Sequence, residues 1–185
     1  MRFAYADPPY PGQSKKHYGD HPDYAGEVDH AELIASLVVD YPDGWALSTD
    51  VRSLRSLLPM CPAEVRVMAW VKPFVSWKKG VYPPYAWEPV LMLGGRNRFG
   101  HTNSPRDWVS ATPPVFTGKG RGTKGQKPDG FCDWLFDCLG ATPEDELVDL
   151  FPGSGAVGDA WHRFLNSPRI DFAGGKDEQI EMDAA

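Results

Sequence analysis

Short apolar runs alternate along the chain with segments of helical period. The runs are rich in aromatic and β-branched residues, which is typical of strands in a mostly parallel sheet. The pattern therefore predicts an α/β fold. The predicted strands are Phe3 to Asp7, Trp45 to Ser48, Val65 to Lys72, Val90 to Leu93 and Leu147 to Leu150.

Four other segments have the periodicity of amphipathic helices with one apolar face. A capping aspartate favours the start of the first of them, and a glycine favours the end of the third. Helices that connect parallel strands are expected to cover both faces of the sheet. The predicted helices follow Asp29, run from Val51 to Leu58 before Pro59, extend from Asp129 to Gly140 and follow Gly155.

The composition is that of a soluble globular chain with a single domain, covering residues 1 to 185. No apolar run approaches the roughly 20 residues that a membrane helix needs. The N-terminus lacks the pattern of a secretion signal, so we expect a cytoplasmic protein that does not enter a membrane. Neither the three cysteines nor the five histidines have the spacing of metal ligands, so no metal site is expected.

The segment from 96 to 127 differs from the rest of the chain in periodicity and charge. It is rich in glycine and proline and holds seven basic residues against one acid, although the whole chain has a net charge of −6. Such a segment is either a solvated loop or a functional one. We favour phosphate contact, because basic side chains on a loop can follow a nucleic-acid backbone while the acidic body stays clear of it. With two lysines nearer the N-terminus, the predicted nucleic-acid-binding residues are Lys15, Lys16, Arg96, Arg98, Lys119, Arg121 and Lys124.

The tetrapeptide Asp7-Pro8-Pro9-Tyr10 follows the first predicted strand directly. Open α/β sheets bind their ligands at this end of the strands. The prolines have no N–H, so the loop presents carbonyl oxygens, and Asp7 and Pro8 are suited to accept both N–H bonds of an exocyclic amine. The Tyr10 ring offers a stacking face to a flipped base. The alternative is a proline-stiffened turn in which Asp7 makes a local bond and Tyr10 caps the core.

A strand, a glycine turn and a helix follow one another from Glu146 to Gly158. Gly153 and Gly155 allow close backbone approach, and the helix N-terminus after them suits an anionic group of a nucleotide-like cofactor. The string also fits the G-x-G-x-x-G pattern of nicotinamide enzymes, but these need further strands after the motif and only 27 residues remain. The order instead fits a permuted fold, in which the strand made last packs against the strand made first.

Together, the two motifs resemble those of the amino-methyltransferases that act on adenine or cytosine in nucleic acids. The Asp-Pro-Pro-Tyr loop of that family is matched by Asp7 to Tyr10, and its phenylalanine-x-Gly-x-Gly loop by Phe151 to Gly155. The order of the motifs resembles the permuted members, among them the β class and the group typified by the eukaryotic messenger-RNA adenine methyltransferases. Lys127-Pro128 before a helix and Trp87-Glu88-Pro89 before a strand resemble two further family segments.

The resemblance implies a Rossmann-like, S-adenosylmethionine-dependent methyltransferase fold with circularly permuted motifs. It also implies direct methyl transfer to the exocyclic amine of a flipped adenine in DNA, because aspartate heads the loop where serine is commoner for cytosine. Asp7, Pro8, Pro9 and Tyr10 would then be catalytic. The implied cofactor-binding residues are Asp149, Phe151, Pro152, Gly153, Ser154, Gly155, Lys127 and Pro128, with Asp171 as the nearest candidate for the acid that holds the ribose.

Other functions stay open from the sequence alone. No separate target-recognition domain is expected, so selectivity would come from the segment Pro11 to Gly26 and the basic loop. A non-catalytic or partner-dependent nucleic-acid-binding subunit, a homo-oligomer, and methylation of RNA, of cytosine or of a small metabolite are the alternatives.

Overall fold

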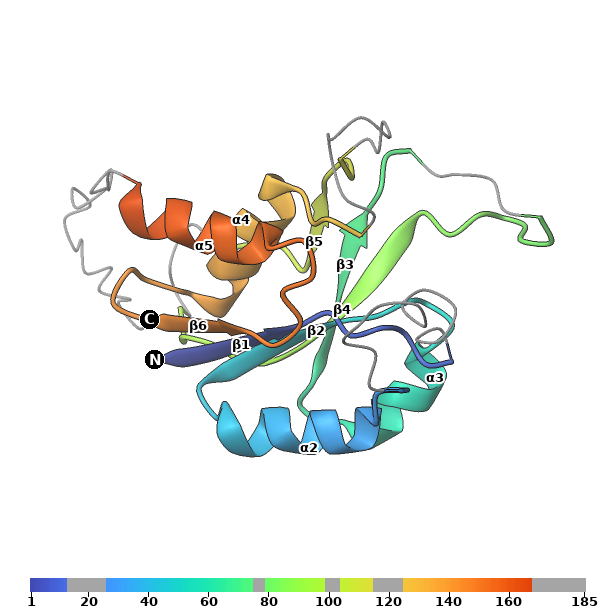
Figure 1. Ribbon diagram of the computed structural model, residues 1–185, viewed down its shortest axis with the longest axis horizontal. Helices are drawn as coiled ribbons and strands as arrows, with labels where there is room; N and C mark the ends of the chain where they lie inside the picture. Colours follow the sequence, from blue (N-terminus) through green and yellow to red (C-terminus); the bar gives the residue numbers. More distant parts are fainter. Residues whose placement is uncertain (13–25, 75–78, 99–103, 115–124, 168–185) are drawn as a thin grey trace, which may run out of the picture.

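The computed structural model describes residues 1–12, 26–74, 79–98, 104–114 and 125–167. In these residues six strands form one sheet, in the order β5-β3-β4-β2-β1-β6, with helices above and below it (Figure 1). Every strand except β4 runs in the same direction, because β4 is antiparallel to both β2 and β3. The strands are β1 (Arg2–Ala6), β2 (Gly44–Ser48), β3 (Arg66–Val71), β4 (Trp87–Gly94), β5 (Trp108–Ser110) and β6 (Glu146–Asp149).

The last strand of the described chain lies beside the first. Strands β1 and β6 are parallel, with Phe3 opposite Leu147 and Tyr5 opposite Asp149. Parallel neighbours end at the same edge of a sheet, so the segments that follow β1 and β6 emerge side by side. This confirms the pairing expected from the permuted order of the motifs.

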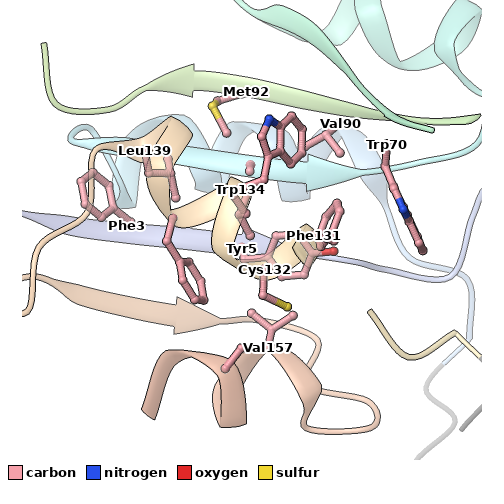
Figure 2. Close-up of a cluster of buried hydrophobic side chains, with 14 of the residues drawn as sticks. Phe3, Tyr5, Trp70, Val90, Met92, Phe131, Cys132, Trp134, Leu139 and Val157 are labelled. Atoms are coloured by element: carbon pink, nitrogen blue, oxygen red, sulfur yellow. The ribbon is translucent and has the colours of Figure 1, made fainter. Parts of the chain in front are cut away.

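Helices cover both faces of the sheet, as predicted. One face packs against α4 (Asp129–Leu139) and α5 (Ala156–Asn166), and its core is rich in aromatic side chains (Figure 2). The ring of Phe131 contacts those of Tyr5 and Trp70 in it. The other face packs against α2 (His30–Asp40) and the short α3 (Leu54–Leu57). None of the helices in the described part of the chain has the length and apolar character needed to span a bilayer.

Local signals in the sequence explain most helix ends. The Asp29 carboxylate accepts hydrogen bonds from the backbone N–H groups of Ala31 and Glu32 at the start of α2. Gly140 ends α4 in the left-handed conformation, with φ of 63°.

Two expectations about secondary structure were wrong. The helix predicted from Val51 to Leu58 is shorter, because Asp50 accepts hydrogen bonds from the N–H and hydroxyl of Ser53 and holds a turn before α3. Pro59 does not end the helical path: it lies at the start of a 3₁₀ turn, η1 (Leu58–Met60), where a missing N–H costs nothing. The segment from 96 to 127 also contains β5, which pairs with β3.

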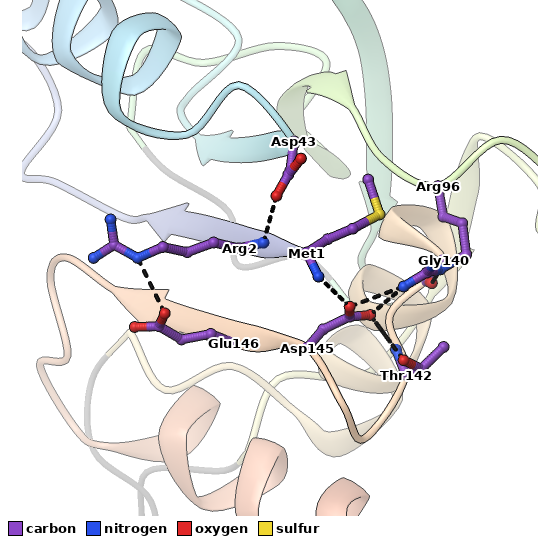
Figure 3. A network of polar contacts seen from close by, with 8 residues as sticks. All are labelled: Met1, Arg2, Asp43, Arg96, Gly140, Thr142, Asp145 and Glu146. Atoms are coloured by element: carbon purple, nitrogen blue, oxygen red, sulfur yellow. Dashed lines mark hydrogen bonds and ion pairs between the residues drawn. The ribbon is translucent and has the colours of Figure 1, made fainter.

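A buried carboxylate, Asp145, links several segments at the amino-terminal ends of β1 and β6. The side chain of Asp145 accepts hydrogen bonds from the Met1 amino group at 2.6 Å, from Arg96 at 2.8 Å and from the N–H of Thr142 at 2.7 Å (Figure 3). Burial alone would raise the pKa of Asp145, but these donors hold it well below its usual range. Arg96 also donates to the carbonyl oxygen of Gly140, so this cluster joins β4, α4 and β6.

Candidate active site

The two segments predicted to carry the chemistry share one pocket. It lies at the carboxyl ends of β1 and β6 and is open to solvent. Asp7 lines one side, and the glycine loop after β6 lines the other. The residues around it include Tyr5, Asp7, Lys127, Asp149, Phe151 and Gly153.

Lys127 links the two sides of this pocket. Its ammonium group forms an ion pair with the Asp7 carboxylate, and its side chain is only 6% exposed, against 24% for Asp7. The ammonium nitrogen also lies 5.8 Å from the ring centre of Trp70 and 6.0 Å from that of Phe131. Lys127 precedes Pro128, the N-cap of α4, and the Pro128 carbonyl accepts hydrogen bonds from the N–H groups of Phe131 and Cys132. Because Lys127 is fixed next to the N-terminus of α4, the ion pair holds the Asp7 carboxylate in one orientation.

Asp149 is the second carboxylate of the pocket. Burial raises its pKa, the negative charge of Asp7 adds to this rise, and the N–H of Phe151 and the charge of Lys127 oppose it. Its Oδ1 accepts the Phe151 N–H at 3.2 Å, whereas its buried Oδ2 has no hydrogen-bond partner within the described residues. A buried oxygen without a partner is costly, so this atom is suited to bind a donor from a ligand.

The glycine loop has a backbone that requires glycine at two positions. Gly153 has φ of 48° and Gly155 has φ of 76°, both in the left-handed region. A Cβ atom on Gly155 would meet nothing within 4 Å, so the loop leaves open space beside the N-terminus of α5. The N–H groups of the first turn of α5, which have no partner within the helix, and the positive end of the helix dipole favour polar or anionic groups of a ligand there.

The Asp-Pro-Pro-Tyr loop is anchored to the ends of β3 and β4 through Tyr10. Pro8 is buried, and the Tyr10 hydroxyl interacts with the Glu88 carboxylate, which forms an ion pair with Lys72. Burial raises the pKa of Tyr10 above its ordinary value, and the charges of Glu88, Asp7 and Asp50 raise it further. Tyr10 is thus a neutral group held by a hydrogen bond to Glu88, and it does not itself line the pocket.

The structure separates the other predicted residues into three sets. Lys15, Lys16, Lys119, Arg121, Lys124 and Asp171 lie outside the described residues. Pro152 and Ser154 line the pocket together with the residues above. Arg96 and Arg98 do not line the pocket, and their role in nucleic-acid binding stays a prediction.

Those two arginines lie at the edge of the sheet where β1 begins. Arg96 pairs with Asp145, and Arg98 donates to the side chain and carbonyl oxygen of Asp137 in the last turn of α4. Their charges are thus neutralised within the protein. Both arginines therefore contribute to the stability of the fold.

Three residues of the site, Tyr5, Ser48 and Lys72, were not singled out from the sequence, and Glu88 was noted only within the segment Trp87-Glu88-Pro89. Tyr5 lines the pocket and its hydroxyl lies 2.8 Å from the Ser48 Oγ, while Lys72 and Glu88 hold Tyr10. Tyr5 and Ser48 read as strand residues, so periodicity gave no signal for them. Lys72 and Glu88 each lie at the carboxyl edge of the sheet, and a charged residue at that edge was the available signal. Among the described residues, no group of three or more histidine, cysteine or acidic side chains is arranged to hold a metal ion.

Comparisons with known proteins support the fold. No family model matches the sequence, and no curated protein matches it either. Several solved structures are similar, among them two of M1.HpyAVI. A crystal structure of an M1.HpyAVI-SAM complex has a TM-score of 0.51 and 18% sequence identity, over 89% of this chain and 78% of the other. A crystal structure of M1.HpyAVI has a TM-score of 0.54 and 15% identity, over 88% and 76%. The chain therefore has a Rossmann-like α/β fold that is shared with these two structures.

Proposed function

We propose that this protein transfers a methyl group from S-adenosylmethionine to the exocyclic amine of adenine in DNA. The observation that carries the proposal is the single pocket in which Asp7, at the head of an Asp-Pro-Pro-Tyr loop, faces Asp149 and the glycine loop. The resemblance of both loops to those of amino-methyltransferases supports it. So does the similarity in fold to M1.HpyAVI, which has been crystallised with SAM.

The residues of the pocket fit the cofactor. S-adenosylmethionine is cationic at its sulfonium and amino groups, and the pocket presents two carboxylates, Asp7 and Asp149, against one ammonium group, Lys127. The buried Oδ2 of Asp149 lacks a donor that the amino group or a hydroxyl of the cofactor can supply. Phe151, Pro152, Gly153, Ser154 and Gly155 would form the wall of this half of the site, with Lys127 and Pro128 at its border.

When bound, the cofactor supplies an electrophilic methyl group. The amine of adenine is a weak nucleophile, because its lone pair is delocalised into the ring, so orientation is the main task of the protein. Asp7 and the Pro8 carbonyl accept the two N–H bonds and direct the nitrogen lone pair toward the methyl group. Pro9 stiffens the loop, and Tyr10 gives the flipped base a face for stacking. The proton released from the nitrogen leaves by way of the Asp7 carboxylate.

Product analysis tests the proposal. The purified protein is incubated with labelled S-adenosylmethionine and unmethylated DNA, and in parallel with RNA, and the digested nucleosides are identified by mass spectrometry. We expect N6-methyladenine from DNA. Methylated adenine from RNA alone, or methylcytosine, would change the substrate in the proposal and leave the methyl-transfer reaction standing. Cofactor binding without any product would favour a subunit that depends on a partner.

The variant Asp7→Ala provides the control for the catalytic loop. It should lose methyl transfer, because the amine is no longer oriented, while calorimetry shows an affinity for the cofactor within a few-fold of the wild type. Transfer at the wild-type rate in this variant would remove Asp7 from the mechanism.

A further inference from the structure

The connection between β3 and β4 exposes large aromatic side chains. We call its described residues, 72–74 and 79–86, the arm; it projects beyond the body of the protein next to α3 (Figure 1). Phe74 is 78% exposed, Tyr82 is 88% exposed and Tyr85 is 49% exposed. Single exposed aromatic residues are common, but three on one projection form a surface suited to a partner with flat apolar groups.

The charge of this connection is opposite to that of the chain. Residues 72 to 86 include three lysines and no acid, whereas the whole chain has a net charge of −6. Lys72 is occupied by Glu88, but Lys79 is exposed. Arg52, before α3, is close enough to Tyr85 to interact with it electrostatically. Aromatic rings interspersed with cations suit a polyanion that carries flat bases.

The root of the arm contacts the catalytic loop. Lys72, its first residue, pairs with Glu88, and Glu88 interacts with the Tyr10 hydroxyl. The ammonium group of Lys72 also lies 4.4 Å from the ring centre of Trp70. If one base of a nucleic-acid strand lies beside Tyr10, the neighbouring nucleotides would therefore lie along the arm.

We propose that the arm binds the nucleic-acid strand that flanks the target base, with Phe74, Tyr82 and Tyr85 stacking on unpaired bases and Lys79 contacting phosphate. This inference rests on the proposed function. The arm would then be a substrate-binding element that connects two strands of the sheet, near the strand ends where the methyl group is transferred. Stacking tolerates any base, so the arm supplies affinity for unpaired nucleotides rather than sequence selectivity.

Binding measurements separate the arm from the chemistry. Fluorescence anisotropy with a labelled single-stranded oligonucleotide compares the wild type with a Phe74→Ala, Tyr82→Ala, Tyr85→Ala triple variant. We expect the triple variant to bind about tenfold more weakly or worse, because alanine cannot stack. Its affinity for S-adenosylmethionine, measured by calorimetry, should stay unchanged. The double variant Tyr82→Phe, Tyr85→Phe keeps both rings and should bind the oligonucleotide like the wild type.

Two further variants test charge and location. Lys79→Gln should lower the salt dependence of binding, reducing the slope of log K against log salt by about 0.7 for a single strand. Val39→Ala removes an apolar side chain on α2 that is 75% exposed, and it should leave oligonucleotide binding intact.

Each outcome bears on a separate part of the argument. Equal oligonucleotide affinity of the wild type and the triple variant would overturn the role of the arm, and would leave the proposed reaction standing if methyl transfer persists. Equal affinity together with a change from dimer to monomer in ultracentrifugation would make the arm an interface between copies of the chain. A wild type that binds no oligonucleotide and methylates no polynucleotide would overturn both proposals.

Discussion

The ion pair between Asp7 and Lys127 predicts an energetic coupling that a double-mutant cycle can measure. Removing one partner of a fully buried pair costs about 3–5 kcal/mol. The Lys127 side chain is 6% exposed and that of Asp7 is 24% exposed, so water can partly replace the lost partner. For Asp7→Ala and for Lys127→Met we therefore expect a loss of about 2–3 kcal/mol each in the free energy of unfolding.

The double variant should lose less than the sum of the single losses. It leaves neither an unpaired ammonium group nor an unpaired carboxylate at this position, and the coupling energy should be about 1–3 kcal/mol. Methionine keeps an unbranched apolar side chain against Trp70 and Phe131, so the contribution of a cavity should be small.

Urea unfolding, followed by tryptophan fluorescence, provides the four free energies, provided that the m-values agree. The exposed pair Asp129 and Arg163, with side chains 77% and 53% exposed, is the control. Its cycle should give a coupling of about 0.5 kcal/mol or less. If the coupling between Asp7 and Lys127 is no larger than that of the control pair, the two charges do not depend on each other and Lys127 does not position Asp7.

Three other substitutions follow from the structure. Asp149→Asn should weaken S-adenosylmethionine binding about 10- to 100-fold by calorimetry, because a charge-assisted hydrogen bond is lost. Burial raises the pKa of Asp149, so its ionised form destabilises the fold at neutral pH. Chemical denaturation without cofactor should therefore show that the variant is at least as stable as the wild type. Asp145→Ala should lower the free energy of unfolding by about 3 kcal/mol at pH 7, the lower end for a buried charge, because Arg96 is partly solvated. The pKa of Asp145 is held below its usual value, so the stabilisation by Asp145 is present above about pH 4 and is lost as the pH falls further. A loss of stability in the variant that stays constant into acid would contradict this. Gly140→Ala should lower the free energy of unfolding by about 1–2 kcal/mol for the left-handed conformation alone, and by more because its Cβ would lie 2.7 Å from that of Arg96. Thermal melting measures the loss, with Gly158→Ala within α5, whose Cβ would meet nothing within 4 Å, as the control.

The order of elements could be predicted from the sequence because each level of signal agreed. Apolar runs of strand length, the Asp29 cap and the Gly140 stop all describe interactions within a few residues of one another. The neighbouring positions of Asp7 and the glycine loop also followed, since two parallel strands that carry ligand-binding turns must end at the same edge.

The interactions that could not be predicted join residues far apart in the chain. Lys127 contacts Asp7 across 120 positions, and Arg96 contacts Asp145 across 49. Nothing in the local pattern around Arg96 distinguishes a structural arginine from one that binds phosphate. The short strand β5 was missed for a similar reason, because its three residues form a strand only where β3 offers an open edge.

Charge is divided in a way that resolves an apparent conflict in the proposed function. An acidic chain repels a polyanion, yet the pocket is lined by two carboxylates, Asp7 and Asp149, of which Asp149 suits a cationic cofactor. Lys127 offsets one of these carboxylates from within the protein, so it reduces the negative field of the pocket without using a surface charge. The arm places its cations and rings at a distance from the acidic body, where phosphate groups can reach them. Cofactor and polynucleotide, which have opposite charges, can then meet at one edge of the sheet through different elements: Asp149 on β6 for the first, and the connection between β3 and β4 for the second.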